Sequence, residues 1–128
     1  MLKIEEGDIL ISRSGTIGKV TYATHDMATN YIVSDDLVRI RVKDPDLRAY
    51  LLAYFASNTA LSLMLLDEYG SVQQHLQPRH IQEMLIPIPD DWTKAQNMID
   101  AGNQFMQAME SMSRADMLIR ENGFDSMV

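Results

Sequence analysis

The sequence predicts an α+β fold, in which a small mixed or antiparallel sheet with packed short helices is followed by a long C-terminal helix of the coiled-coil type. Three observations predict it. The first fifty residues alternate short apolar runs with glycine-containing turns, the middle of the chain has helical apolar spacing, and the last third repeats apolar residues every seven positions. A chain of 128 residues is long enough to bury a core of its own.

Three strands are expected in the first part of the chain. Asp8–Ser12 and Ile17–Tyr22 flank the turn Arg13–Thr16, where Gly15 can adopt a positive φ. These two strands form a hairpin with an exposed polar tip. The third strand, Leu37–Val42, alternates apolar and basic residues and therefore buries one of its faces.

The basic face of that third strand presents Arg39 and Arg41. They could line a basic stripe. We instead expect them to pair with nearby acidic side chains on an exposed sheet face, namely Asp35, Asp36 or Asp46.

The middle of the chain is expected to be helical. Asp44-Pro45-Asp46 is typical of a helix start, and apolar residues then follow at helical spacing up to Phe55. Ser57-Asn58 ends that helix, and a second one is expected over about residues 59–67. Gly70 opens a polar loop that continues to Gln77, after which Pro78 begins a short helical turn. Met84–Pro89 predicts a strand, which its two prolines confine to a sheet edge.

A long helix, capped by Asp91, is predicted to continue to about Arg120 without a proline. Apolar and alanine side chains recur along it with a period of seven, which predicts a seam for a partner helix. The seam consists of Met98, Ala101, Phe105, Ala108, Met112, Ala115 and Ile119. Gly102 beside the seam would allow close approach of another helix. No second heptad segment exists in the chain, so we expect self-association through Phe105 and Met112.

The composition excludes several classes of chemistry. There is no cysteine, which removes disulfides, thiolate zinc sites and cysteine nucleophiles. The three histidines lack metal-ligand spacing, the acidic pairs Asp35-Asp36 and Asp90-Asp91 suit caps or turns, and Ser12 and Ser14 lack a nucleophile elbow. We therefore expect no catalytic residue, no metal and no cofactor on this chain.

Neither a membrane span nor a secretory signal is evident. No apolar run approaches the roughly 18 residues that a span needs, and the N-terminus is acidic within six residues. A cytoplasmic location is therefore expected.

The charge of the chain is unevenly distributed. The formal net charge of −7 argues against a protein that coats nucleic acid by itself. Seven of the eleven basic residues nevertheless lie in residues 1–50, beside eight acidic ones. Binding to DNA by such a chain should be weak and strongly dependent on salt, unless a partner supplies further positive charge.

Two polar groups are candidates for contact with DNA. The first lies at the hairpin tip, where backbone amides and side-chain donors can meet phosphates or base edges, and consists of Arg13, Ser14, Thr16 and Lys19. The alternative is an ordinary surface turn in which Arg13 pairs with Asp8 or Asp26.

The second group lies in the loop that Gly70 opens and at the helical turn that follows it. Glutamine can bind adenine through two hydrogen bonds, and arginine can bind guanine in the same way. The candidates are Gln73, Gln74, His75, Gln77 and Arg79. The alternative is a solvated loop whose glutamines cap the turn at Pro78.

Residues 7–20, GDILISRSGTIGKV, resemble the GDIL-S-R-G-GK stretch of target recognition domains in type I restriction–modification specificity subunits. The order that follows also resembles that family: a basic strand, a YL--YF-S helical element, a glycine-opened polar loop and an I---IPIP segment before a long helix. The resemblance covers about residues 5–119.

This resemblance implies sequence-specific recognition of double-stranded DNA by a non-catalytic module of a bacterial or archaeal system. In that family a recognition domain binds one half of a split target, and long helices pair as a spacer that docks methyltransferase subunits. Residues 1–89 would be part of a recognition domain, 90–122 a spacer or dimerisation helix, and 123–128 a tail. The competing hypothesis is a protein–protein adaptor or oligomerisation module without direct DNA contact.

Overall fold

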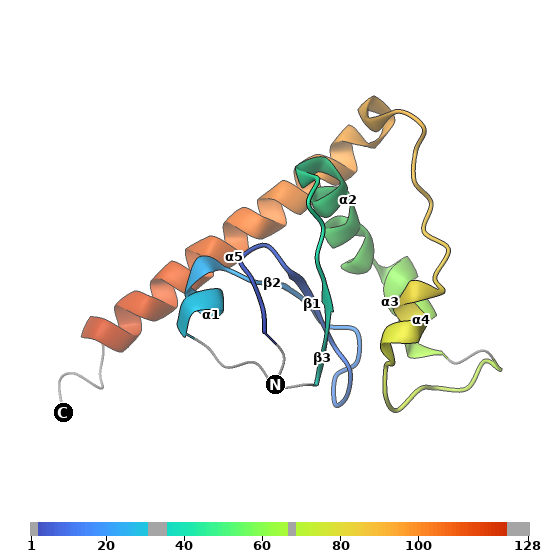
Figure 1. Cartoon of the computed structure of the whole chain (residues 1–128), viewed down its shortest axis with the longest axis horizontal. Helices are drawn as coiled ribbons and strands as arrows, with labels where there is room; N and C mark the ends of the chain where they lie inside the picture. The colour runs from blue at the N-terminus through green and yellow to red at the C-terminus, as the bar shows by residue number, and fades with distance from the viewer. Residues whose placement is uncertain (1–2, 31–35, 67–68, 123–128) are drawn as a thin grey trace.

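The computed structural model describes residues 3–30, 36–66 and 69–122. Three short antiparallel strands and several helices precede one long helix, which confirms the predicted α+β class (Figure 1). The order along the chain is β1 (Ile9–Ser12), β2 (Val20–Tyr22), α1 (His25–Asn30), β3 (Leu37–Ile40), α2 (Pro45–Phe55), α3 (Asn58–Leu65), α4 (Pro78–Gln82), the 3-10 helix η1 (Trp92–Ala95) and α5 (Gln96–Asn122). The expected tail, 123–128, lies outside the described residues.

The sheet has the order β2-β1-β3, so β1 is its central strand. Ile11 pairs with Val20 on one side and with Val38 on the other. One face of β1 places Ile9 and Ile11 in the main core against α2. The opposite face places Leu10 in a smaller cluster with Ile4 and Ala23, so both faces of this short strand are buried.

Side-chain hydrogen bonds cap both middle helices, and the start signal predicted at Asp44 is confirmed, whereas Ser57 was expected only to end the first helix. The Asp44 carboxylate accepts a hydrogen bond from the Asp46 amide at 3.0 Å and caps α2. The Ser57 hydroxyl accepts from the Ala60 amide at 3.2 Å and caps α3. Both caps satisfy amides that the first turn of a helix leaves unpaired.

The sequence interpretation missed helix α1. Its Asp26 is almost fully buried, and the carboxylate accepts a hydrogen bond from Arg120 of α5 at 2.9 Å and one from Asn30 at 2.7 Å. Thr24, also buried, contacts Ser113 of α5 with 3.1 Å between the hydroxyl oxygens. These contacts attach α1 to the second half of α5, at the end opposite to α3 and α4 (Figure 1).

The first half of α5 packs closely on α2. A Cβ added at Gly102 would lie 1.9 Å from the carbonyl oxygen of Ala49, so only glycine permits this approach of the two helices. Ile99 is buried beside it, and Trp92 packs edge-on against Tyr50 with 5.5 Å between ring centroids. Asp91 accepts from the Thr93 amide at 3.0 Å, which lowers the pKa of Asp91. The cap expected at Asp91 is thus present, and it caps the 3-10 helix η1 that leads directly into α5.

The strand predicted at Met84–Pro89 is wrong. These residues run extended between α4 and η1 without joining the sheet, and Pro87 and Pro89 have no amide hydrogen to offer to a neighbouring strand. The Tyr50 hydroxyl donates to the Pro87 carbonyl oxygen, which holds the segment against α2.

Arg41 pairs with residues other than those expected. Its guanidinium binds both carboxylate oxygens of buried Asp8, at 2.8 and 2.9 Å, and approaches Glu5 at 3.3 Å. Arg39 donates to the carbonyl oxygen of Lys3. The expected partners were Asp35, Asp36 and Asp46, of which Asp35 lies outside the described residues. Burial raises the pKa of Asp8, but the hydrogen bonds from Arg41 and from the Glu5 amide outweigh that effect and hold the pKa below its usual value.

Candidate nucleic-acid interface

The structure brings the two predicted polar groups together. The Leu76 amide donates to the Arg13 carbonyl oxygen at 2.7 Å, and the Arg13 side chain donates back to the Leu76 carbonyl oxygen at 3.0 Å. The same guanidinium reaches the side-chain oxygen of Gln77 at 3.2 Å. The hairpin tip and the loop after Gly70 therefore form one surface, although 63 residues separate Arg13 from Leu76.

The hairpin tip is fixed by its own hydrogen bonds. The Ser12 amide donates to the Lys19 carbonyl oxygen at 3.0 Å, and the Ser12 hydroxyl accepts from the Lys19 amide at 2.9 Å. Ser14 donates to the carboxylate of Asp36. Gly18 has a φ of 82°, and a Cβ there would lie 2.9 Å from Leu61. These hydrogen bonds fix the backbone of the turn, and the side chains of Thr16 and Lys19 are exposed on it.

Gln73 anchors the loop to the end of α3. Its amide nitrogen Nε2 donates to the carbonyl oxygens of Met64 at 2.7 Å and Leu66 at 3.2 Å, and its backbone amide donates to Leu65 at 2.7 Å. These carbonyls belong to the last turn of a helix, which leaves its acceptors unpaired. Gln73 is thus committed to positioning the loop.

The start of α4 is organised by Gln77 and His80. The Gln77 amide donates to Nδ1 of His80 at 2.9 Å, and the His80 amide donates to the Gln77 carbonyl oxygen at 2.9 Å. The short helical turn expected at Pro78 is confirmed. Because Gln77 also accepts from Arg13, α4 is connected to the hairpin tip.

Within the described residues, five of the nine predicted DNA-binding side chains make no hydrogen bond or ion pair inside the chain. They are Thr16, Lys19, Gln74, His75 and Arg79, and all five are exposed. The other four, Arg13, Ser14, Gln73 and Gln77, are engaged in holding the tip and the loop. The Arg13 side chain binds the carbonyl oxygen of Leu76 and the side-chain oxygen of Gln77, two partners that the sequence alone did not suggest.

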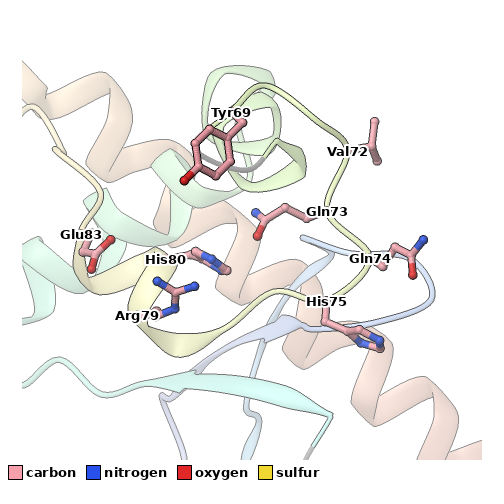
Figure 2. Close-up of a pocket in the computed structure, with 8 residues that line it drawn as sticks. All are labelled: Tyr69, Val72, Gln73, Gln74, His75, Arg79, His80 and Glu83. Atoms are coloured by element: carbon pink, nitrogen blue, oxygen red, sulfur yellow. The ribbon is translucent and has the colours of Figure 1, made fainter.

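A hollow of about 390 Å³ lies between the loop and α4 (Figure 2). Tyr69 lies across it from Arg79 and His80, and the side-chain amide of Gln73 points into it. Glu83, directly after α4, closes one end. The sequence interpretation missed Tyr69, Val72 and Glu83; an aromatic residue directly before Gly70, in an otherwise polar loop, was the available signal.

The predicted helix-pairing residues differ in burial between the first and the second half of α5. Met98 and Phe105 are half-buried and pack against the main core of the same chain. Further along, Met112 and Ile119 are 68% and 64% exposed. The three seam alanines are exposed in both halves. The large apolar residues of the predicted seam are therefore open to a partner only in its second half.

Together, the small sheet, the loop surface and the long helix define an α+β domain with a helical extension. The chain belongs to the type I restriction modification DNA specificity domain family, whose model matches residues 2–111. No curated protein and no solved structure matches the chain. No helix of the described residues is long and apolar enough to cross a membrane.

Proposed function

We propose that this chain recognises a short DNA sequence through the surface formed by the hairpin tip and the loop Gly70–Gln77, and that it has no catalytic role itself. The observation that supports this proposal is the reciprocal pairing of Arg13 with Leu76. It joins two polar segments into one surface on which five unpaired polar side chains are exposed.

The side chains on this surface have distinct chemical capacities. Gln74 can bind the N6 and N7 atoms of adenine, and Arg79 can bind the O6 and N7 atoms of guanine, both in the major groove. Lys19 is suited to a phosphate, which fixes the protein on the duplex without selecting sequence. A loop anchored beforehand loses little conformational entropy when it binds, which favours selective contacts.

The role of positioning methyltransferase subunits belongs to the same proposal. The chain carries 18 acidic and 11 basic residues, so its own attraction to the duplex is small. A methyltransferase partner would supply positive charge and the reaction with S-adenosylmethionine, and its catalytic step needs an adenine extruded from the duplex at a fixed place. The recognition surface would set that place.

The test is selection of duplexes from a random pool at low salt, using the full chain assembled with its methyltransferase subunit. One short sequence should be enriched. Gln74→Ala and Arg79→Ala should each relax selection at particular base positions, because each removes one pair of base contacts. Uniform weakening at all positions would assign these residues to phosphate contacts, and a pool without any enriched sequence would refute recognition.

A second candidate function, a protein–protein adaptor, is favoured by one observation. Met112, Leu118 and Ile119 expose more than half of their side chains along the second half of α5. Such an apolar stripe suits a partner helix, whether from a second copy or from another subunit. An adaptor without DNA contact would still pair through α5 but would enrich no sequence in the pool.

A further inference from the structure

We propose that the hollow between the loop and α4 is a binding site for an amino-bearing nucleobase: adenine, cytosine or guanine rather than thymine. The inference rests on the proposed function, because it concerns the same DNA-facing loop. It gives a ligand-binding role to Tyr69, Gln73 and Glu83, three residues that have no part in the proposed major-groove contacts.

The shape of the hollow suits a planar ring. Its volume of about 390 Å³ lies within the range of small-molecule sites. Tyr69 forms one side, and the planar groups of Arg79 and His80 form the other (Figure 2). A base inserted between them would stack on an aromatic ring, and stacking of this kind strengthens binding by on the order of tenfold to a hundredfold per base.

The hydrogen-bonding groups select the kind of base. Nε2 of Gln73 is committed to two carbonyl oxygens, so the amide cannot turn over and its oxygen Oε1 is the atom left for a ligand. The Glu83 carboxylate is a second acceptor. Two acceptors favour a ligand with an exocyclic amino group, which thymine lacks.

The same groups disfavour a phosphate. A carboxylate beside Arg79 offsets the attraction of the guanidinium for an anion. Nδ1 of His80 accepts a hydrogen bond from the Gln77 amide, so Nε2 is the ring nitrogen that can donate to a ligand. An uncharged ring with both donors and acceptors matches this mixture.

Val72 supplies the second, independent observation. It lies at the rim of the hollow with 74% of its side chain exposed, beside a Gln73 that is fixed by three hydrogen bonds. Exposed apolar side chains can insert between base steps and partly unstack them, which helps a base to leave the duplex. Extrusion is cheapest when the base is already unpaired, which gives a direct way to test the site.

The test uses the full chain and a set of duplexes that differ at one position only. In the unpaired duplexes an A, C, G or T lies opposite an abasic site, and in the control duplex the same position carries an intact base pair. Fluorescence anisotropy at low salt should show at least tenfold tighter binding for unpaired A, C or G than for the intact duplex, and less than threefold for unpaired T. Tyr69→Ala and Glu83→Ala should abolish the gain, whereas Tyr69→Phe, which keeps the ring, should retain it. Thermal melts should confirm that these exposed positions leave the fold intact.

A second arm uses free adenosine and thymidine in ligand-observed NMR. If adenosine gives a binding signal that Tyr69→Ala removes, the base alone is sufficient for binding. If tighter binding is seen only with the unpaired duplexes, the base must be presented by DNA. Either result supports the site. The site is refuted if neither arm responds, or if the gain survives Tyr69→Ala and Glu83→Ala. Enrichment of a target sequence by the assembled complex without any gain for unpaired bases would refute this site and leave the proposed function standing.

Discussion

The side chain of Arg13 donates to the carbonyl oxygen of Leu76 at 3.0 Å, while the amide of Leu76 donates to the carbonyl oxygen of Arg13 at 2.7 Å. The two residues come from a hairpin turn and from a loop far along the chain. Leu76 is fully buried, so its carbonyl oxygen cannot exchange this donor for water. Arg13 therefore positions the loop Gly70–Gln77 through contacts within its own chain.

Arg13→Ala should lower the free energy of unfolding by about 1.5–3 kcal/mol, because it removes a charge-assisted bond to a buried carbonyl. Selection among DNA sequences should also weaken, since the loop loses its anchor, while the dependence of affinity on salt stays the same. Urea denaturation and binding at several salt concentrations measure these effects. In the control Lys19→Ala, stability should not change and the salt slope should fall by about 0.9. If Arg13→Ala instead keeps normal stability and lowers the salt slope by the same amount, Arg13 contacts a phosphate.

Gln73 and Gln74 are neighbours with opposite expected effects. Gln73→Ala should cost about 1–2 kcal/mol of stability, because the carbonyl oxygens of Met64 and Leu66 lose a donor. Gln74→Ala should change stability by less than about 0.5 kcal/mol. It should nevertheless reduce discrimination at one base pair by about 1–3 kcal/mol. Thermal melts and competition binding with single-base variants distinguish the two, and equal losses of stability would contradict the assignment.

Gly102→Ala should separate α5 from α2. The added Cβ would lie 1.9 Å from the Ala49 carbonyl oxygen, and backbone atoms cannot move aside as a flexible side chain can. We expect a loss of about 1–3 kcal/mol or more in urea denaturation. Asn103→Ala, at the next and exposed position, should be neutral or slightly stabilising because alanine has the higher helix propensity. Equal stability of both variants would show that the helices do not pack this closely.

Pairing through α5 should depend on Met112 and Ile119. Replacing both with glutamate places charge on the exposed part of the seam and should convert a self-associating chain to a monomer in size-exclusion chromatography with light scattering. Stability should change little, since both side chains are exposed. Adding the same two charges off the seam, as Asn103→Glu with Gln107→Glu, should leave association intact. A wild-type chain that stays monomeric at high concentration would refute self-association.

Stability should fall in acid through Asp8. Its pKa is lower in the folded chain than in the unfolded chain, so the unfolded state binds more protons and stability rises with pH. The contribution is complete above the unfolded pKa of about 3.9 and is lost as pH falls through the lower folded pKa. Urea denaturation between pH 2.5 and 7 should show this loss. In Asp8→Asn the same interval should be flatter, and an unchanged slope would exclude Asp8 as the cause.

Local signals in the sequence predicted most of the elements correctly. The caps at Asp44 and Asp91 lie within three residues of the amides they bind, so sequence pattern alone suffices to find them. Helix α1 is only six residues long and is held by Arg120 on α5, a partner 94 residues away. Met84–Pro89 has the composition of a strand but no strand partner, which only the arrangement of the sheet could reveal.

The candidate site divides in the same way. The sequence by itself determined the family resemblance, the α+β order and the two polar segments, because these depend on residue type and short spacing. Only the tertiary structure decided that Arg13, Gln73 and Gln77 hold the loop, that Gln74, His75 and Arg79 are left exposed, and that Tyr69 and Glu83 line a hollow beside them. The physical reason is that a polar side chain is available to a ligand only when it is not already hydrogen-bonded within its own chain. The Arg13 side chain binds Leu76 and Gln77, which lie more than sixty positions away along the chain.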